Sequence, residues 1–361
     1  MKDTKLLPLK KLEEFYMLRS MYSGISGLKA QQTKLDIVGN NIANANTTAF
    51  KSQSIRFQDM LSQNMSSATG PSANLGGTNP RQVGLGVQVA GIFTKFTTGN
   101  MQTTGRNLDM AVDGPGFFIV GKGDITSQTS IITEGTDDAQ AGSIDGKSST
   151  MDISFTRDGS FTLDDEGNLL TSDGFRIMGY AMTDGTGTSL AYDAGTGEAK
   201  MAFVDADSKA LKAADDSKKL IPLRIPDEIE VEGKKVRVQS FSIDKDGLLV
   251  ASLVNGKSAA LGQVAMASFK NEGGLEKMGK NLYKNSANSG EAIIRTPRGT
   301  AEENRNDKGY GDMLNGMIEM SNVDLAEEFT EMIVANRAFQ ACGKMITTGD
   351  EILQELVNLK R

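Results

Sequence analysis

The chain has 361 residues and a net charge of −7, with 24% of its residues charged and 38% hydrophobic. This fits one large or two modest domains, with no apolar run long enough for membrane insertion and no basic tracts that would favour nucleic acid. Because the sequence contains no His and one Cys, Ser-His-Asp and Cys-His catalysis, an internal disulfide and a thiolate metal cluster are excluded. We therefore expect no catalytic residue, no cofactor and no metal site.

The first residues, 1–16, lack the apolar run and the small-residue cleavage site of a secretory signal. The tripeptide at 12–14, Leu-Glu-Glu, is compatible with codons that contain a GGAGG ribosome-binding tract. We hypothesise that translation starts at Met17 and that residues 1–16 are an untranslated leader. A nucleotide sequence without a GGAG-like tract at those codons would refute this.

An amphipathic helix is predicted from Met17 onward. Its apolar positions recur in alternating steps of four and three, which keeps one seam on one side of a helix. The seam comprises Met21, Ile25, Leu28, Gln32, Leu35, Gly39 and Ile42.

The stretch 44–48 is rich in Asn and Thr, which favour caps and turns. We expect the first helix to end there and a helix to resume over 50–61. The side chains of Asn40, Asn41, Asn44 and Asn46 either bridge helix ends and connectors through hydrogen bonds or only end the helix.

The middle of the chain predicts a mainly β domain over 83–287. Short apolar runs flank Asp-Gly and Asn-Gly turns, as in a hairpin over 155–161. Two Gly/Ser/Asp-rich stretches, at about 123–151 and 183–219, are expected to be inserted loops or a small subdomain. Residues 62–82 and 288–311 are expected to be extended connectors.

Four segments of the middle resemble ligand-binding motifs without their structural context. Residues 141–148 and 251–258 match the phosphate loop loosely, but neither lies between a buried strand and a helix, and Asn-Gly in the second favours a hairpin turn. Residues 164–168 and 244–247 resemble fragments of calcium loops, but they lack the full ligand set. Asp-Gly hairpin turns are the simpler interpretation of both.

A second amphipathic helix is predicted at the C-terminus. A further apolar set (Ile333, Cys342, Met345, Ile352 and Leu356) widens its stripe, so this helix has more than one apolar side. Cys342 is interpreted as a small core residue rather than a nucleophile. The main stripe comprises Leu325, Phe329, Met332, Asn336, Phe339, Gly343, Ile346, Asp350, Leu353 and Val357.

Together these patterns predict an α+β protein in which paired, coiled-coil-like terminal helices flank a mainly β domain. Residues 17–61 and 312–361 would form the core through which copies polymerise. The alternatives are helices that only pack on their own domain, an enzyme with ligand-dependent stability, and a monomeric adhesin. The predicted polymer interface consists of Ile25, Leu28, Leu35, Ile42, Leu325, Phe329, Met332, Phe339, Ile346 and Leu353.

Three groups of motifs resemble those of bacterial flagellar rod and hook proteins. Ala49 stands where that family usually has Gly. The groups are YSGISGL at 22–28 with DIVGNNIAN at 36–44 and NTTAFK at 46–51; GRNLDMAVDG at 105–114 with GFF at 116–118; and SNVDL at 321–325 with MIVANRAFQ at 332–340, ITT at 346–348 and LVNL at 356–359.

This resemblance implies a helical homopolymer whose paired terminal helices form an inner tube around an export channel, with the β domain outside. It also implies export without a cleaved signal through the flagellar type III apparatus, an extracellular location, and distal rod, hook cap and hook–filament junction proteins as partners. The inserted stretches favour the hook type, a flexible joint that transmits motor torque to the filament. The distal rod type is the alternative.

Overall fold

The computed structural model describes residues 7–71, 76–123, 132–133, 142–144, 151–185, 187–192, 199–208, 211–213, 220–231, 233–295 and 311–359. The chain divides into two compact units. The helix unit contains Met1–Ala45, Lys51–Lys95 and Val323–Arg361, and the β unit contains Asn46–Phe50 and Phe96–Asn322. Each is described by itself below.

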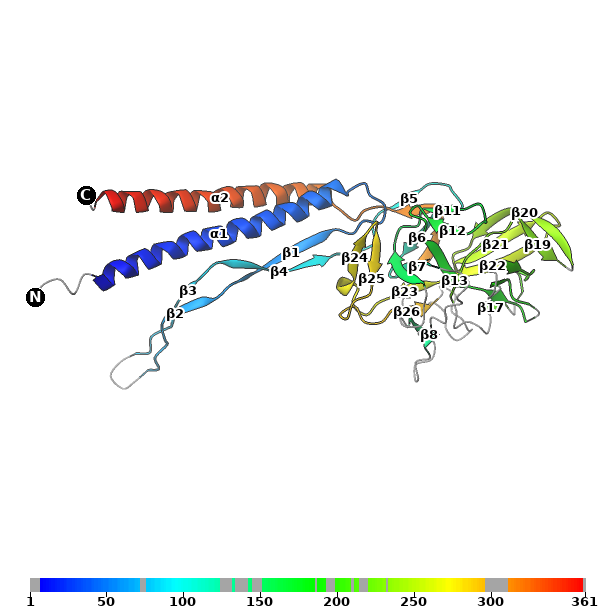
Figure 1. The fold of residues 1–361 in the computed structure, drawn as a ribbon, viewed down its shortest axis with the longest axis horizontal. Helices are drawn as coiled ribbons and strands as arrows, with labels where there is room; N and C mark the ends of the chain where they lie inside the picture. The colour runs from blue at the N-terminus through cyan, green and yellow to red at the C-terminus, as the bar shows by residue number, and fades with distance from the viewer. Residues whose placement is uncertain are drawn as a thin grey trace, which may run out of the picture. The chain divides into compact units, whose positions relative to one another are not determined.

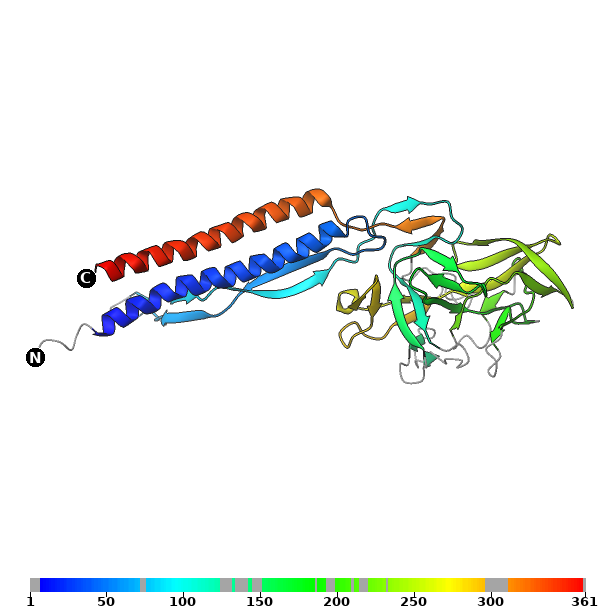
Figure 2. The ribbon, with the colours of Figure 1, turned by 45° about the horizontal axis from the view of Figure 1, so that its top comes forward.

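Two long helices form most of the helix unit: α1 (Leu7–Ala43) and α2 (Leu325–Asn358). Helix α2 begins where Asp324 caps it, because the Asp324 carboxylate accepts the backbone N–H groups of Ala326 and Glu327. The start of α1 falls within the expected leader, of which residues 1–6 lie outside the described part of the chain. The two helices lie side by side in both views (Figures 1 and 2).

A β-ribbon completes the helix unit. Strand β1 (Gln53–Asp59) pairs antiparallel with β4 (Val87–Thr94), and β2 (Ser62–Ser66) pairs with β3 (Arg81–Gly84). Helix α1 contacts α2 on one side and strands β1 and β4 on another (Figure 1).

The expectation of a helix over 50–61 is therefore wrong, because pairing with β4 and packing on α1 override the local preference. The expected extended connector 62–82 contains strands β2 and β3.

The β unit is built from short strands and one 3₁₀ turn, η1 (Glu272–Gly274). The strands are β5 (Met101–Thr103), β6 (Met110–Asp113), β7 (Phe117–Lys122), β8 (Ile132–Thr133), β9 (Gly142–Ile144), β10 (Asp152–Thr156), β11 (Phe161–Leu163), β12 (Leu169–Thr171), β13 (Arg176–Tyr180), β14 (Met182–Thr183), β15 (Leu190–Tyr192), β16 (Ala199–Met201), β17 (Lys212–Ala213), β18 (Ile221–Pro222), β19 (Glu228–Val231), β20 (Lys234–Ile243), β21 (Leu248–Leu253), β22 (Ser258–Val264), β23 (Met266–Ser268), β24 (Glu276–Gly279), β25 (Leu282–Lys284), β26 (Ile293–Arg295), β27 (Asp312–Asn315) and β28 (Met317–Glu319).

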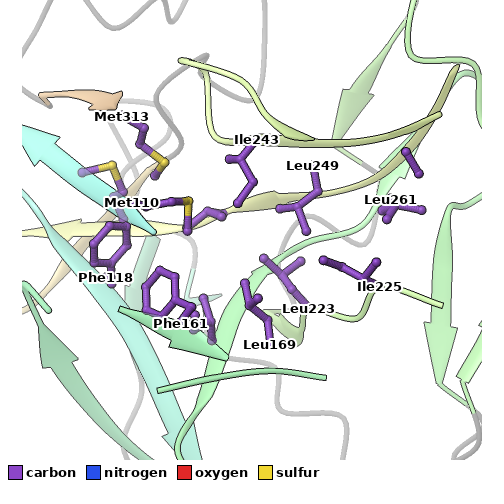
Figure 3. Close-up of a cluster of buried hydrophobic side chains, with 14 of the residues drawn as sticks. Met110, Phe118, Phe161, Leu169, Leu223, Ile225, Ile243, Leu249, Leu261 and Met313 are labelled. Carbon is purple, nitrogen blue, oxygen red and sulfur yellow. The ribbon is translucent and has the colours of Figure 1, made fainter. Parts of the chain in front are cut away.

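Strand β7 lies at the centre of the main sheet, where it pairs with β10, β13 and β23. Successive side chains of a strand point to opposite faces. Accordingly, Phe118 and Val120 belong to one hydrophobic cluster, and Phe117 and Ile119 to another. Figure 3 shows part of the first cluster, in which Phe118 packs edge-on against Phe161 with ring centroids 5.2 Å apart.

A buried ion pair lies inside the β unit. Arg157 and Glu319 approach to 3.5 Å with almost no solvent exposure, and Arg157 also donates to the Gly114 carbonyl at 2.8 Å. The Glu319 carboxylate accepts the Gly99 N–H at 2.8 Å, and its carbonyl accepts the Ala49 N–H. The pair therefore ties together segments that are far apart in the sequence. Removing one partner would leave a buried charge, which is costly.

Ala49 adopts a left-handed backbone conformation, with φ of 55°, and is buried. Gly reaches this region without the steric cost that a Cβ brings. The conformation therefore gives a physical reason why Gly would suit this position better than Ala.

Part of each predicted insertion lies outside the described residues. Within 123–151 the structure describes β8 and β9, and within 183–219 it describes the pairs β14–β17 and β15–β16. Val204 and Leu211 from the second stretch pack with Met182, Leu248 and Ala260 in a small cluster of their own. Of the expected connector 288–311, residues 296–310 lie outside the description, and β26 precedes them.

Candidate assembly interface

The two helices of the helix unit pack antiparallel through small residues. A Cβ added to Gly24 would lie 3.2 Å from Ile346 Cγ1, and one added to Gly27 would lie 3.0 Å from Cys342 Sγ. At the far end of this contact, Gly349 approaches Met21 in the same way. These glycines let the helix backbones approach closely, and Cys342 is a half-buried packing residue between them.

Asn41 joins three elements near the end of α1. Its side-chain amide donates to the Gln53 carbonyl and to Glu328 Oε1, each at 2.8 Å, and its Oδ1 accepts the Gln53 N–H at 3.0 Å. Asn41 thus links α1 to β1 and to α2 while being buried itself. Of the two interpretations left open for the Asn residues, bridging therefore holds for Asn41.

The Asn44 amide donates to Asn40 within the same helix end. This contact is local, and the choice between the two interpretations stays a prediction for Asn44.

Charged side chains lie near the hydrogen bond between Asn41 and Glu328. Burial raises the pKa of the Glu328 carboxyl; the hydrogen bond from Asn41 lowers it, and the nearby Glu331 and Glu327 raise it further. Glu331 pairs with Lys34 at 3.5 Å, and Glu327 pairs with Lys95 at 3.9 Å. Both pairs are partly exposed, so each contributes little alone.

The predicted interface residues of α1 lie beside the α1–α2 contact rather than in it. Ile25 is 39% exposed, and Leu28, Leu35 and Ile42 are half-buried. The buried positions of this helix are instead Gly24, Gly27, Ala30, Ile37, Val38 and Asn41.

The predicted residues of α2 divide in the same way. Met332, Ile346 and Leu353 are half-buried, whereas Leu325, Phe329 and Phe339 are exposed. Ala335 is fully buried and marks the line that faces the rest of the unit. The interface role of all these residues stays a prediction.

Most of the exposed apolar side chains of α2 form two stripes; Phe339 and Val357 are exposed too and belong to neither. An α-helix turns by about 100° per residue, so residues 325, 329 and 333 lie on one side of the Ala335 line, and residues 334, 345, 352 and 359 lie on the other. We call them the N-terminal stripe (Leu325, Phe329 and Ile333) and the C-terminal stripe (Val334, Met345, Ile352 and Leu359), and every member is exposed.

Sequence reasoning missed the small-residue contact and the Asn41–Glu328 bond. The three-residue spacing of Gly24, Gly27 and Ala30 was a usable signal for a close helix approach. The bond to Glu328 had no sequence signal, because its partners are 287 positions apart.

The central motif 105–114 has a structural role inside the β unit. Thr104 donates to the buried Asp109 carboxylate at 2.6 Å, and Arg106 pairs with the same carboxylate at 3.4 Å. The Asp109 carbonyl accepts the Gly316 N–H, which joins this motif to the segment between β27 and β28.

The motif fragments that imitate ligand sites form turns where the structure describes them. Residues 251–258 connect β21 to β22, where Asn255 Oδ1 accepts the Lys257 N–H, so the hairpin expectation is confirmed. Burial would raise the pKa of Asp164, but hydrogen bonds from Asn168 and Glu166 outweigh it and lower the pKa. Residues 141 and 145–148 of the other loop lie outside the description.

Across the ranges that the structure describes, no group of three or more acidic or Cys residues is arranged to hold a metal ion. Within the same ranges, neither helix is long and apolar enough to cross a membrane.

Three family models match the sequence. "Flagella basal body rod protein" matches residues 21–51, "Flagellar hook protein FlgE/F/G D1 domain" matches 145–251, and "Flagellar basal body rod FlgEFG protein C-terminal" matches 314–359. The first and last matches cover much of α1 and all of α2.

Similar proteins come from both branches of this group. The flagellar basal-body rod protein FlgG of Bacillus subtilis is 40% identical over 345 residues, covering 96% of this chain and 100% of that protein. The flagellar hook protein FlgE of Borreliella burgdorferi is 32% identical over 449 residues, covering 95% and 100%.

A crystal structure of the hook protein FlgE2 of Helicobacter pylori matches 61% of this chain and 100% of that chain, with 10% identity and a TM-score of 0.36, which is too low to carry an argument. The family assignment rests on the sequence relatives instead. The chain therefore belongs to the family of flagellar basal-body rod and hook proteins, which are structural proteins rather than enzymes.

Proposed function

We propose that this chain is a subunit of the flagellar hook, which polymerises through its terminal helices into a flexible tube. The observation that carries the proposal is the exposure of two apolar stripes on α2. Phe329 is 47% exposed and Ile333 is 62% exposed, although both lie within a long, regular helix. Exposed apolar stripes of this length mark surfaces that bury themselves against a partner.

The arrangement of the stripes favours many neighbours over a simple dimer. The N-terminal and C-terminal stripes lie on different sides of α2, so one flat partner cannot cover both. A subunit whose helix contacts a different copy on each side builds a ring or a helical tube, because such heterologous contacts do not close after two copies. In that tube the predicted interface residues of α1 and α2 would lie between neighbouring helix pairs.

The proposal also covers the export and assembly of the subunit. It would leave the cell through the flagellar type III export apparatus without a cleaved signal, and assemble outside the cell. Its neighbours would be further copies of itself, the distal rod, a hook cap and the hook–filament junction proteins. The β unit would form the outer wall, where polar loops suit sliding contacts during bending.

The distal rod protein is the second candidate, and the comparisons give it specific support. The rod relative FlgG of Bacillus subtilis is 40% identical, against 32% for the hook relative FlgE of Borreliella burgdorferi. The alignment with that FlgE also runs over 449 positions, more than the 361 residues of this chain, so that hook protein carries residues without a counterpart here. This weakens inserted sequence as an argument for the hook type.

Electron microscopy of basal bodies from a strain that lacks this gene distinguishes the two candidates. The hook proposal predicts complete rods and rings without hooks. Truncated rods would assign the chain to the distal rod, with the same assembly chemistry. Normal hooks and filaments would contradict both assignments.

A further inference from the structure

A groove of about 440 Å³ lies in the helix unit between α1 and the β-ribbon. The ribbon is held against the helix beside it, since the Val87 N–H donates to Ser26 Oγ at 3.3 Å. Gly86 packs so closely there that an added Cβ would collide with the Ser26 side chain.

Apolar side chains that remain exposed line the groove. Tyr22 and Ile25 come from α1 and are 66% and 39% exposed, while Met60 and Val89 come from the ribbon and are 44% and 37% exposed. Among the described residues that line it, Lys29 alone is charged. The groove therefore suits an apolar helix face that carries an acidic residue at its margin.

The C-terminal stripe of α2 has these properties. Met345 and Ile352 are exposed and seven residues apart, so they lie on one side of the helix. Glu355 follows Ile352 by three residues and therefore projects from the same side of α2. On α1, Lys29 follows Ile25 by four residues and projects from the same side in the same way. The N-terminal stripe is the poorer match, because Glu328, which follows Leu325 by three residues, is half-buried and already accepts a hydrogen bond from Asn41.

The stripe that fills the groove cannot come from the same chain. In the antiparallel pair Gly27 faces Cys342, so Lys29 lies near that level of α2. Glu355 is thirteen residues further along, about 20 Å away at 1.5 Å per residue. A contact between Lys29 and Glu355 therefore requires two copies.

We propose that the groove between α1 and the β-ribbon binds the C-terminal stripe of α2 from a second copy, with Ile352 inside the groove and Glu355 beside Lys29. This inference rests on the proposed polymerisation and names the two surfaces that meet. It makes the β-ribbon part of the binding site and not only a connector.

Disulfide trapping between two singly substituted full-length chains tests the contact. In a Cys342→Ser background, one chain carries Val89→Cys and the other Ile352→Cys, and the two are mixed under assembly conditions and oxidised. We expect a cross-linked dimer in polymers and not in dilute monomer. A control mixture of the Val89→Cys chain with a Phe329→Cys chain should give several-fold less.

Equal cross-linking to the Phe329→Cys chain, or none to the Ile352→Cys chain in intact polymers, would overturn this contact and leave polymerisation standing. Failure of the Cys342→Ser chain and the unmodified chain to polymerise at all would instead contradict the proposed function.

Charge reversal provides an independent readout. Lys29→Glu and Glu355→Lys should each raise the protein concentration needed for assembly several-fold, and the double variant should restore it toward the original value. Because both side chains are exposed in the monomer, neither change should unfold the helix unit. A double variant as poor as the worse single variant would contradict the pairing.

Discussion

The β unit buries its large apolar side chains, and the helix unit leaves many of its own exposed. Phe118 and Phe161 are fully buried between strands, whereas Phe329 is 47% exposed on α2. The β unit thus gains its stability from contacts within one chain. The helix unit packs through its seam but leaves part of its apolar surface exposed, and we propose that other copies bury that part. The contrast separates residues that matter for folding from residues that matter for assembly.

The largest expected difference in stability comes from replacing one Phe by Ala in each unit. Phe118→Ala should lower the free energy of unfolding of the β unit by about 3–5 kcal/mol, because it leaves a cavity in a closed core. Phe329→Ala should change the stability of the monomer by less than about 0.5 kcal/mol, since the ring is exposed. Chemical denaturation followed by near-UV circular dichroism measures both. A large loss for Phe329→Ala would mean that this surface is already covered in the monomer.

The helix seam should be the next most sensitive feature. Gly27→Leu should destabilise the helix pair by about 1–3 kcal/mol, because the new side chain meets Cys342 where the backbones approach. Gly39→Ala is the matched control: nothing lies within 4 Å of its Cβ position, so it should stabilise α1 by about 0.5–1 kcal/mol. Thermal melting of the helical signal at 222 nm compares them. A harmless Gly27→Leu would contradict the close packing.

The Asn41 bridge should contribute a similar or smaller amount. Asn41→Ala removes its hydrogen bonds to Gln53 and Glu328, and we expect a loss of about 1–3 kcal/mol. Asn40→Ala, one residue away and exposed, should cost less because it loses only a local contact with Asn44. The same thermal melts decide this, and equal losses for the two variants would show that Asn41 has no bridging role.

The smallest expected effect comes from Glu328 and is a pH dependence of the stability of the helix unit. Burial raises its folded-state pKa above the ordinary value of a Glu carboxyl, so between these two values the folded protein binds a proton that the unfolded chain does not. The helix unit should therefore become more stable as pH falls through the raised pKa, until the unfolded carboxyl is also protonated. Glu328→Gln should remove this increase. A variant with an unchanged pH profile would assign the dependence to other groups.

Much of this contrast was predictable from the sequence because periodicity reports which side of an element is apolar. The spacing of apolar residues identified both terminal helices, and the Asn-Gly turn identified the hairpin of β21 and β22. The hairpin expected over 155–161 is wrong, because β10 pairs with β7 and β25 while β11 pairs with β12. The strand Gln53–Asp59 was missed because its pairing with Val87–Thr94 is a tertiary contact. The packing of α1 on α2 through small residues, rather than through the larger apolar stripe of α1, was also missed although its spacing was a usable signal. Helix propensity counts Gly24 and Gly27 as unfavourable, while the packed pair uses them for close approach.

The most direct test of the central claim is assembly of the full-length chain with Phe329→Asp and Phe339→Asp, followed by electron microscopy. A chain with Thr330→Asp and Thr347→Asp gains the same charges and keeps both rings, so it separates charge from the loss of apolar surface. Our account predicts that the Phe variant forms no tubes while the near-UV spectrum of its β unit is unchanged. Tubes of normal appearance from that variant would contradict the claim that α2 carries the assembly interface.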